Sequence, residues 1–301
     1  MEIISVIPRG YCQGVVRAIQ TARRTAQDNP GVKVTMLGMI VHNRYVVDAC
    51  RQLGIRFVED KTRTRLELLD QVDEGIVIFT AHGVCDAVRR KAEQKGLTVV
   101  DATCQDVIRT HTIVREHVKN GDVIYIGKKN HPEAEGTTGI SDRIHLVTCP
   151  EDVRRYPGLE NVLITNQTTL SIIEIQDIIR ACLEMYPDAV ISKEICNATR
   201  VRQEAVLALK DCDLLIVVGD SASNNSRQLA LTGKQSGIPQ SVLIDSALDL
   251  KEDMIRNKNR IAVTSGSSTP NELTSQVIDT LQHYADTGEF ILPDSVSCRL
   301  L

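Results

Sequence analysis

The chain has 301 residues, of which 42% are hydrophobic and 25% are charged, and its net charge is -4 at pH 7. This composition is typical of a globular protein of two or three domains and excludes a disordered, fibrous or small disulfide-stapled chain. The slight acidity argues against nucleic-acid binding, although a local pocket for a small anion remains compatible with it. No stretch approaches the roughly 20 apolar residues of a membrane span and the N-terminus does not resemble a signal peptide, so we expect a cytoplasmic protein.

The start of the chain predicts a strand, a turn and a helix, and this order recurs twice. The predicted strands lie at 3–7, 97–100 and 189–191, and each runs into a cysteine. These cysteines are Cys12, Cys104 and Cys196, which are 92 residues apart. Apolar residues at helical spacings then predict helices over 15–26, 107–118 and 201–209. Coincidence is the alternative explanation of the equal spacing, but the matching order of elements argues for an internal repeat.

Three further strands and a closing helix are predicted in each repeat. The second strands lie in KVTMLGMI, DVIYIGKKN and DLLIVVGD, the third in IRFV, RIHLV and SVLI, and the fourth in IVIFT, VLIT and IAVT. Polar clusters follow the second and fourth strands. Alternating short strands and helices predict small, mostly parallel sheets, whose ligands gather beyond the carboxyl ends of the strands. We therefore predict three α/β domains at 1–96, 97–188 and 189–288 and a C-terminal tail at 289–301.

The repeated cysteines predict a metal site. The nine cysteines are too widely spaced for a disulfide framework and form no CxxC pair, so some of them should carry chemistry in a reducing compartment. If the three repeats meet around a pseudo-threefold axis, their three thiolates reach one point. Three thiolates could hold a zinc ion with a water, or a [4Fe-4S] cluster in which one iron lacks a protein ligand. The large separation along the chain favours the bulkier cluster. We expect most of the other six cysteines to be buried small hydrophobes or inert surface thiols.

The polar clusters predict an anion site. They contain His42, His82, His131, Thr168, Ser223, Asn224, Asn225 and Ser268. Imidazolium, hydroxyl and amide donors near helix N-termini suit a phosphate or diphosphate. Single histidines at strand ends are more often structural, and Ser/Asn runs are more often turns or caps. Glu133 is the candidate acid, with Glu135 and Asp220 as rival carboxylates and a solvated loop residue as the plain alternative.

Together these segments resemble the family of 4-hydroxy-3-methylbut-2-enyl diphosphate reductases, which end the methylerythritol phosphate route to isoprenoids. The segments that carry the resemblance are PRGYCQGVVRAI, GMIVHNRYVV, FTAHGV, VVDATCQDV, GKKNHPEAEGT, TNQTTLS, EICNATRVRQEAV, SNNS and TSGSSTP. The resemblance implies a trefoil of three pseudo-threefold-related α/β domains around one [4Fe-4S] cluster per chain, held by Cys12, Cys104 and Cys196. This sequence departs from the common family pattern at Asn224, where many members have Ser. It also departs at Gln105 and Asn197, which follow the second and third repeated cysteines.

The resemblance also implies roles for the polar residues. His42, His82, His131, Ser223, Asn225 and Ser268, with Asn224 less firmly, would bind the diphosphate, and Thr168 would orient the substrate's allylic hydroxyl. That hydroxyl would bind the open iron, and Glu133 would supply a proton as two electrons expel water, giving isopentenyl or dimethylallyl diphosphate. The chain has no GxGxxG fingerprint, so we expect electrons to come from another protein. The resemblance implies that this protein is a ferredoxin or flavodoxin. We expect a monomer that binds neither nucleic acid nor membranes.

Two other classes use part of the same pattern. A zinc hydrolase would hold zinc on the three cysteines and would be colourless. A non-catalytic iron-sulfur sensor would bind a cluster but would not need the histidine, Glu133 and Ser/Asn set. Metal and sulfide analysis distinguishes a zinc hydrolase from the reductase. Turnover with a reduced dye distinguishes a non-catalytic sensor from it.

Overall fold

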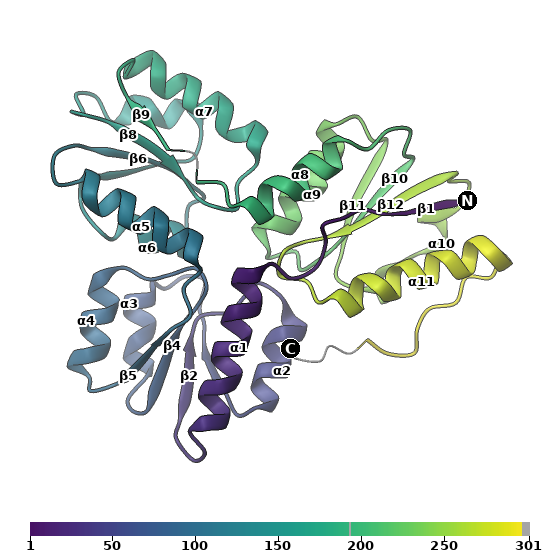
Figure 1. Ribbon diagram of the computed structural model, residues 1–301, viewed down its shortest axis with the longest axis horizontal. Helices are drawn as coiled ribbons and strands as arrows, with labels where there is room; N and C mark the ends of the chain where they lie inside the picture. The colour runs from purple at the N-terminus through teal and green to yellow at the C-terminus, as the bar shows by residue number, and fades with distance from the viewer. Residues whose placement is uncertain (193, 297–301) are drawn as a thin grey trace. The chain divides into compact units, whose positions relative to one another are not determined.

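The computed structural model describes residues 1–192 and 194–296 and has an α/β fold with three four-stranded sheets (Figure 1). Every strand pairing among the described residues is parallel. The predicted α/β class and small parallel sheets are therefore confirmed. The end of the predicted tail, from residue 297 and including Cys298, lies outside the described residues.

All twelve strands predicted from the apolar runs are present. The sheets have the orders β3-β2-β4-β5, β7-β6-β8-β9 and β1-β12-β10-β11. Their bounds are β1 Glu2–Ser5, β2 Val34–Leu37, β3 Arg56–Val58, β4 Ile76–Phe79, β5 Thr98–Asp101, β6 Val123–Ile126, β7 Ile144–Val147, β8 Leu163–Asn166, β9 Val190–Ile191, β10 Leu214–Val218, β11 Gln240–Ile244 and β12 Arg260–Ser265. The two central strands of each sheet are almost wholly buried, which explains their continuous apolar sequence.

The strand that leads to each cysteine pairs with the last strand of another predicted repeat. Strand β5 pairs with β4, β9 with β8, and β1 with β12. A parallel pair needs a crossover, and the helix that closes a repeat returns the chain beside the strand it has just left. The sheets are therefore offset by one strand from the predicted segments 1–96, 97–188 and 189–288.

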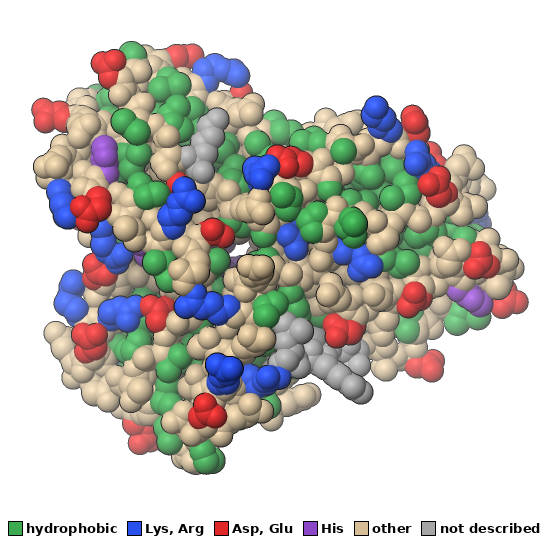
Figure 2. Space-filling model, in the orientation of Figure 1, with side chains coloured by type: hydrophobic (Ala, Val, Ile, Leu, Met, Phe, Trp, Pro, Cys, Tyr) green, Lys and Arg blue, Asp and Glu red, His purple; other side chains and the backbone are tan. Residues whose placement is uncertain are grey.

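Helices follow most of the strands. Their bounds are α1 Gln13–Asp28, α2 Arg44–Gln52, α3 Arg65–Leu68, α4 Asp86–Gln94, α5 Gln105–His117, α6 Pro132–Thr138, α7 Ile172–Met185, α8 Asn197–Leu207, α9 Asn224–Gln235, α10 Glu252–Ile255 and α11 Asn271–Thr287, with 3-10 turns at Leu69–Gln71, Pro150–Arg155 and Ala247–Asp249. None of the described helices is both long and apolar enough to cross a bilayer. Figure 2 shows charged side chains of both signs interspersed on the face that it draws.

The chain divides into two compact units. Among the described residues, the first contains 1–15, 41–49 and 197–296, and the second contains 16–40, 50–192 and 194–196. The first unit holds the sheet of β1, β10, β11 and β12, with one core cluster between that sheet and α11 and a second that includes Leu229 and Ala230 of α9. The second unit holds the other two sheets, each with its own apolar core.

Three of the helices begin at the polar clusters. Helix α2 starts at Arg44, two residues after His42, while α6 starts at Pro132 and α9 at Asn224. His131 is the N-cap of α6 and Pro132 its first residue, while Ser223 is the N-cap of α9 and accepts the Ser226 N–H at 3.3 Å. These polar side chains therefore lie at helix N-termini, where backbone N–H groups favour anions.

Candidate active site

Each repeated cysteine follows the edge strand of its sheet and is tied to the loop after the neighbouring strand. In all three cases the cysteine backbone N–H donates to the carbonyl oxygen of the residue two positions beyond that strand. The bonds are Cys12 to Ser267 (3.0 Å), Cys104 to Ala81 (3.0 Å) and Cys196 to Thr168 (3.1 Å). The equal spacing in sequence thus corresponds to one backbone arrangement built three times, which argues against coincidence.

The surroundings of these cysteines suit thiolate ligands. Cys12, Cys104 and Cys196 are all partly exposed, and each immediately precedes a helix, namely α1, α5 or α8. A helix N-terminus stabilises a thiolate, the form that binds iron. Cys182 and Cys212 contrast with them, because both are buried and burial raises the pKa of each thiol, that of Cys182 to about 11. The chemistry of the repeated cysteines therefore fits an iron-sulfur cluster.

The carboxyl group of Glu133 is buried and is held by Thr168. Glu133 is 1% exposed, and it lies in the first turn of α6. Its Oε1 accepts the Thr168 backbone N–H at 2.7 Å, and its Oε2 accepts the Thr168 hydroxyl at 2.9 Å. Burial raises the pKa of Glu133 to about 7, although the Thr168 and Tyr125 hydrogen bonds act in the opposite direction. This carboxyl group can therefore hold and release a proton near neutral pH.

The rival carboxylate Glu135 has a different environment. Its Oε1 accepts the backbone N–H of Arg65 at 2.6 Å, at the start of α3. Arg65 itself is buried and pairs with Glu59 at 3.2 Å. Burial raises the pKa of Glu135 as well, but its carboxylate fastens α6 to α3 of the neighbouring sheet. The other rival, Asp220, accepts backbone N–H groups of Arg44 and Ala222 in the first unit.

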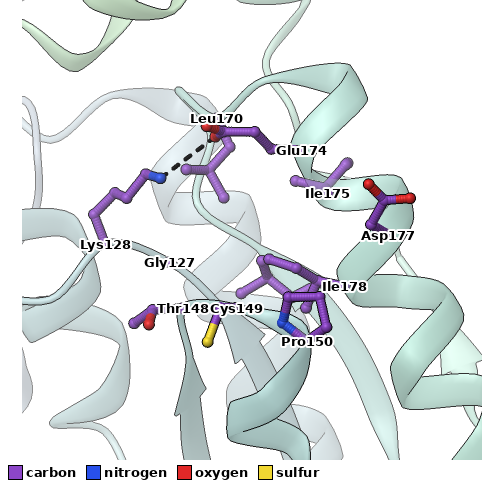
Figure 3. A pocket seen from close by; sticks show the side chains of 11 residues that line it. Gly127, Lys128, Thr148, Cys149, Pro150, Leu170, Glu174, Ile175, Asp177 and Ile178 are labelled. Carbon is purple, nitrogen blue, oxygen red and sulfur yellow. Dashed lines mark hydrogen bonds and ion pairs between the residues drawn. The ribbon is translucent and has the colours of Figure 1, made fainter.

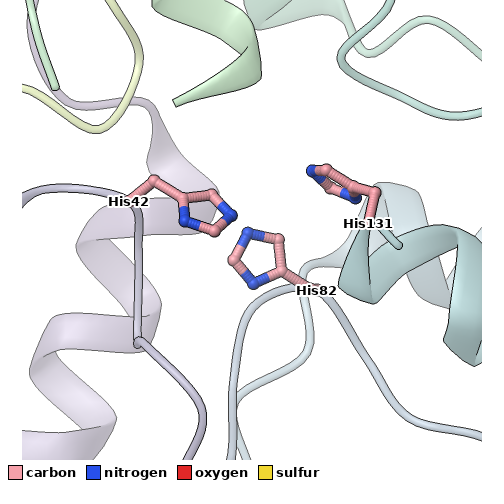
Figure 4. A group of neighbouring side chains, drawn as sticks. All are labelled: His42, His82 and His131. Atoms are coloured by element: carbon pink, nitrogen blue, oxygen red, sulfur yellow. The ribbon is translucent and has the colours of Figure 1, made fainter. Parts of the chain in front are cut away.

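Two of the candidate histidines lie together in the second unit. The rings of His82 and His131 are edge to face, with centroids 5.6 Å apart (Figure 4). His82 comes from the loop after β4, where its Nδ1 lies 3.3 Å from the Thr80 hydroxyl. His131 Nδ1 accepts the Glu133 backbone N–H at 3.2 Å, so its Nε2 carries the hydrogen in the neutral ring and is a donor. The pair is therefore suited to an anionic ligand.

The Ser/Asn set lies in the first unit and is nearly fully buried. Ser223, Asn224, Asn225 and Ser268 are each 3% to 6% exposed. The Ser268 hydroxyl lies 3.2 Å from the backbone oxygen of His42 and 3.4 Å from the Ser223 hydroxyl. The Ser268 hydroxyl thus joins the loop after β12 to the loop that leads into α2. His42, which lies in this second loop, is shown in Figure 4.

The amide of Asn225 also serves to hold two loops of the first unit. Its oxygen accepts the Ser267 N–H at 2.9 Å, and its nitrogen donates to the Thr199 hydroxyl at 3.0 Å. Ser267 is the residue whose carbonyl oxygen accepts the Cys12 N–H. The same loop therefore connects a predicted cluster ligand with a predicted diphosphate ligand.

A cavity of about 220 Å³ lies beyond the carboxyl ends of β6 and β7 (Figure 3). Ile175, Ile178 and Leu170 form much of its apolar wall, and an ion pair between Lys128 and Glu174 at 3.4 Å lies across it. The predicted cysteine, histidine and Glu133 side chains are not among its lining residues. This cavity is therefore separate from the groups that the sequence singles out.

Sequence reasoning missed two polar residues that touch the predicted site. Tyr125 lies on β6 with its hydroxyl 3.4 Å from Glu133 Oε1, and Thr199 on α8 holds Asn225. The signal for Tyr125 was available, because a phenol in the otherwise apolar strand VIYI needs a polar partner when it is buried. No comparable signal marks Thr199, since threonine is common in helices.

Comparison with known proteins gives one consistent result. The family model for LytB protein matches residues 3–282. The 4-hydroxy-3-methylbut-2-enyl diphosphate reductase of Brevibacillus brevis is 48% identical over 290 residues, which cover 94% of this chain and 92% of that protein. The enzyme of the same name from a Geobacillus species is 45% identical, with 94% and 91% covered.

Two solved structures are similar as well. The E-1-hydroxy-2-methyl-but-2-enyl-4-diphosphate reductase from Plasmodium falciparum has a TM-score of 0.87 and 30% identity over 99% of this chain and 93% of that one. A second reductase, described as the terminal enzyme of the non-mevalonate pathway, has a TM-score of 0.66 and 30% identity, with 94% and 100% covered. The matches extend along nearly the whole chain, and the α/β fold agrees with them. The chain belongs to the LytB family of 4-hydroxy-3-methylbut-2-enyl diphosphate reductases.

Proposed function

We propose that this protein reduces (E)-4-hydroxy-3-methylbut-2-enyl diphosphate to isopentenyl diphosphate and dimethylallyl diphosphate. The reaction takes up two electrons and two protons, breaks the C–O bond of the allylic hydroxyl and releases water. Support comes from the names of the relatives and from a site that combines repeated cysteines, anion donors and a buried acid. The repeated backbone bond at Cys12, Cys104 and Cys196 is the observation that carries the proposal.

The three repeated cysteines are the proposed ligands of one [4Fe-4S] cluster. Each is held by its backbone, so its thiol does not have to be ordered by the metal alone. When bound, the cluster supplies single electrons and an iron position without a protein ligand. Cys50, Cys182 and Cys212 are unsuited to this role because they are buried in the apolar interior.

The proposed diphosphate ligands are His42, His82, His131, Ser223, Asn224, Asn225 and Ser268. His131 and Ser223 cap α6 and α9, and helix N-termini favour phosphate oxygens. Hydroxyl and imidazole groups there replace the water that a diphosphate loses on binding. This explains how a chain with net negative charge can bind a highly charged anion.

Glu133 is the proposed acid, and Thr168 connects it to the substrate's hydroxyl. The pKa of about 7 keeps a large fraction of the carboxyl groups protonated at neutral pH. Thr168 holds the carboxyl by its N–H and its hydroxyl, so a proton on Oε2 can pass outward through that hydroxyl. Transfer to the leaving hydroxyl lets it depart as water instead of hydroxide.

The proposed reaction needs an external source of electrons. A ferredoxin or flavodoxin is the proposed donor, and the protein is proposed to act as a monomer. Anaerobic purification, iron and sulfide analysis, and turnover with a reduced dye test the whole proposal. We expect about four iron and four sulfide per chain and formation of both diphosphate products. Zinc in place of iron, or a cluster without turnover, would contradict the proposal.

A further inference from the structure

Tyr125 is a polar residue in the buried part of the second unit. It lies on the central strand β6, whose four residues are all buried, and the tyrosine is 0% exposed. Its hydroxyl lies 3.4 Å from Oε1 of Glu133 and also hydrogen-bonds with Thr137 of α6. A buried phenol hydroxyl has lost its hydrogen bonds to water, so it needs hydrogen-bond partners within the protein. Here these partners include the proposed acid.

The strand is shaped to let this phenol reach Glu133. Gly127 directly follows β6 and lies two residues after Tyr125. A Cβ on Gly127 would lie 2.9 Å from Cε1 of the Tyr125 ring, closer than two carbons can pack. The missing side chain therefore makes room for the ring. On its other sides the ring packs in an apolar cluster that includes Val114 and Ala134.

The hydrogen bonds distinguish the two carboxyl oxygens of Glu133. Oε1 faces the Thr168 backbone N–H, which can only donate, and the Tyr125 hydroxyl. Oε2, by contrast, accepts from the Thr168 hydroxyl, which can either donate or accept. The carbonyl oxygen of a protonated carboxyl group is its better acceptor. Two donors at Oε1 therefore favour a proton on Oε2.

We propose that Tyr125 is a positioning residue for Glu133. Its hydroxyl joins the Thr168 N–H in holding Oε1 as the accepting oxygen, so that the transferable proton is on Oε2 beside the Thr168 hydroxyl. The same bond stabilises the carboxylate that remains after transfer. This inference rests on the proposed role of Glu133 as the acid and assigns to Tyr125 no contact with the substrate.

The other titratable groups around this carboxyl come from three elements. Asp106 of α5 raises the pKa of Glu133, as a nearby negative charge should. His131 at the start of α6 accepts the Glu133 backbone N–H through Nδ1. Tyr125 itself stays protonated, because burial and the adjacent carboxylate raise its pKa well above the usual value. Tyr125 is therefore a donor throughout the range in which Glu133 titrates.

The direct test follows the protonation of Glu133 in cluster-loaded Tyr125→Phe protein. Difference infrared spectroscopy detects the C=O stretch of a protonated carboxyl group, and Glu133→Gln identifies the Glu133 band by its disappearance. Loss of one hydrogen bond to the carboxylate should raise the midpoint of this titration by about 0.5–1 pH unit. The alkaline limb of the pH profile of kcat should move in the same direction, with KM little changed.

Tyr156→Phe is the matched control. The Tyr156 hydroxyl makes a similarly long bond of 3.3 Å, but to the backbone oxygen of Leu146. The Tyr156→Phe substitution should leave the midpoint of the Glu133 titration unchanged. If Tyr125→Phe fails to fold, Gly127→Ala displaces the same ring while keeping its hydroxyl, and it should raise the midpoint too.

An unchanged or lowered midpoint in folded Tyr125→Phe would overturn the inference. The result also separates it from the proposed function. If Glu133→Gln has lost turnover while Tyr125→Phe titrates like the parent, only the role of Tyr125 is wrong. If Glu133→Gln turns over normally, the acid assignment fails first and the inference fails with it.

Discussion

Thr168 contacts both oxygens of the Glu133 carboxyl group, one through its backbone and one through its side chain. The distances are 2.7 Å from the Thr168 nitrogen to Oε1 and 2.9 Å from its hydroxyl to Oε2. The carbonyl oxygen of Thr168 meanwhile accepts the Cys196 N–H. One residue thus fixes the position of the proposed acid relative to a proposed cluster ligand.

Replacing Glu133 with Gln should separate chemistry from binding. Glutamine keeps the size and hydrogen-bonding capacity but has no transferable proton, so single-turnover reduction should fall roughly 10²- to 10⁴-fold. Substrate affinity should change far less. Both quantities can be measured on one anaerobic sample.

Glu135→Gln is the control for that experiment. Its amide oxygen can still accept the Arg65 N–H, so the link between α6 and α3 should persist. Reduction at the parental rate is expected. If Glu135→Gln loses most of the reduction rate while Glu133→Gln keeps the parental rate, Glu135 is the acid and Glu133 is not.

Stability should depend on pH through Glu133. The pKa of its carboxyl group is raised from 4.5 to about 7 in the folded protein, so the folded state binds this proton more tightly than the unfolded chain. The associated stability is complete below pH 4.5 and is lost as the pH rises through 7, about 3 kcal/mol in all. Between pH 5 and 8 the melting temperature of the parent should fall more than that of Glu133→Gln, and parallel curves would disprove the effect.

The cysteine assignment predicts a sharp difference between two single substitutions. Cys104→Ser should lose the cluster or leave fragments of it, because one of three ligands is gone. Cys85→Ser should keep it, since Cys85 also precedes a helix but is not one of the three cysteines of the repeat. Iron and sulfide analysis of anaerobically purified protein measures both. Full cluster content in Cys104→Ser would refute the assignment.

Ser268→Ala should weaken substrate binding while leaving the cluster intact. Loss of one charge-assisted hydrogen bond costs about 1.5–3 kcal/mol, which corresponds to roughly ten- to a hundredfold in affinity. Ser236→Ala serves as the control, because Ser236 lies at the C-terminal end of α9 and its hydroxyl donates to the Gly233 carbonyl oxygen of the same helix. Equal affinities for the two variants would remove Ser268 from the proposed site.

Much of the fold was predictable because the central strands are buried on both faces. Their continuous apolar runs identified the strands, and their alternation with helices identified parallel sheets. The pairing of β1 with β12 was not predictable in this way. Nothing local in residues 2–5 specifies a partner more than 250 positions away, since that choice depends on which sheet has an open edge.

The site was predictable where chemistry-bearing residues follow strands. Glu133 and Glu135 illustrate the limit, since both lie in the first turn of α6 and have the same side chain. Only the fold shows that one faces Thr168 and the other Arg65. Tyr125 illustrates the opposite case, in which a polar residue within an apolar strand was visible but its partner was not.

The pairing of β1 with β12 also imposes an order on biosynthesis. The backbone bonds of Cys104 and Cys196 reach partners earlier in the chain, Ala81 and Thr168, so each can form as soon as its own cysteine has left the ribosome. Cys12 must wait for Ser267, which is made much later than Cys12 itself. A nascent chain that stalls before β12 therefore leaves β1 without its partner strand and Cys12 without its backbone bond. All three cysteines reach their final backbone setting only after β12 and Ser267 have been made.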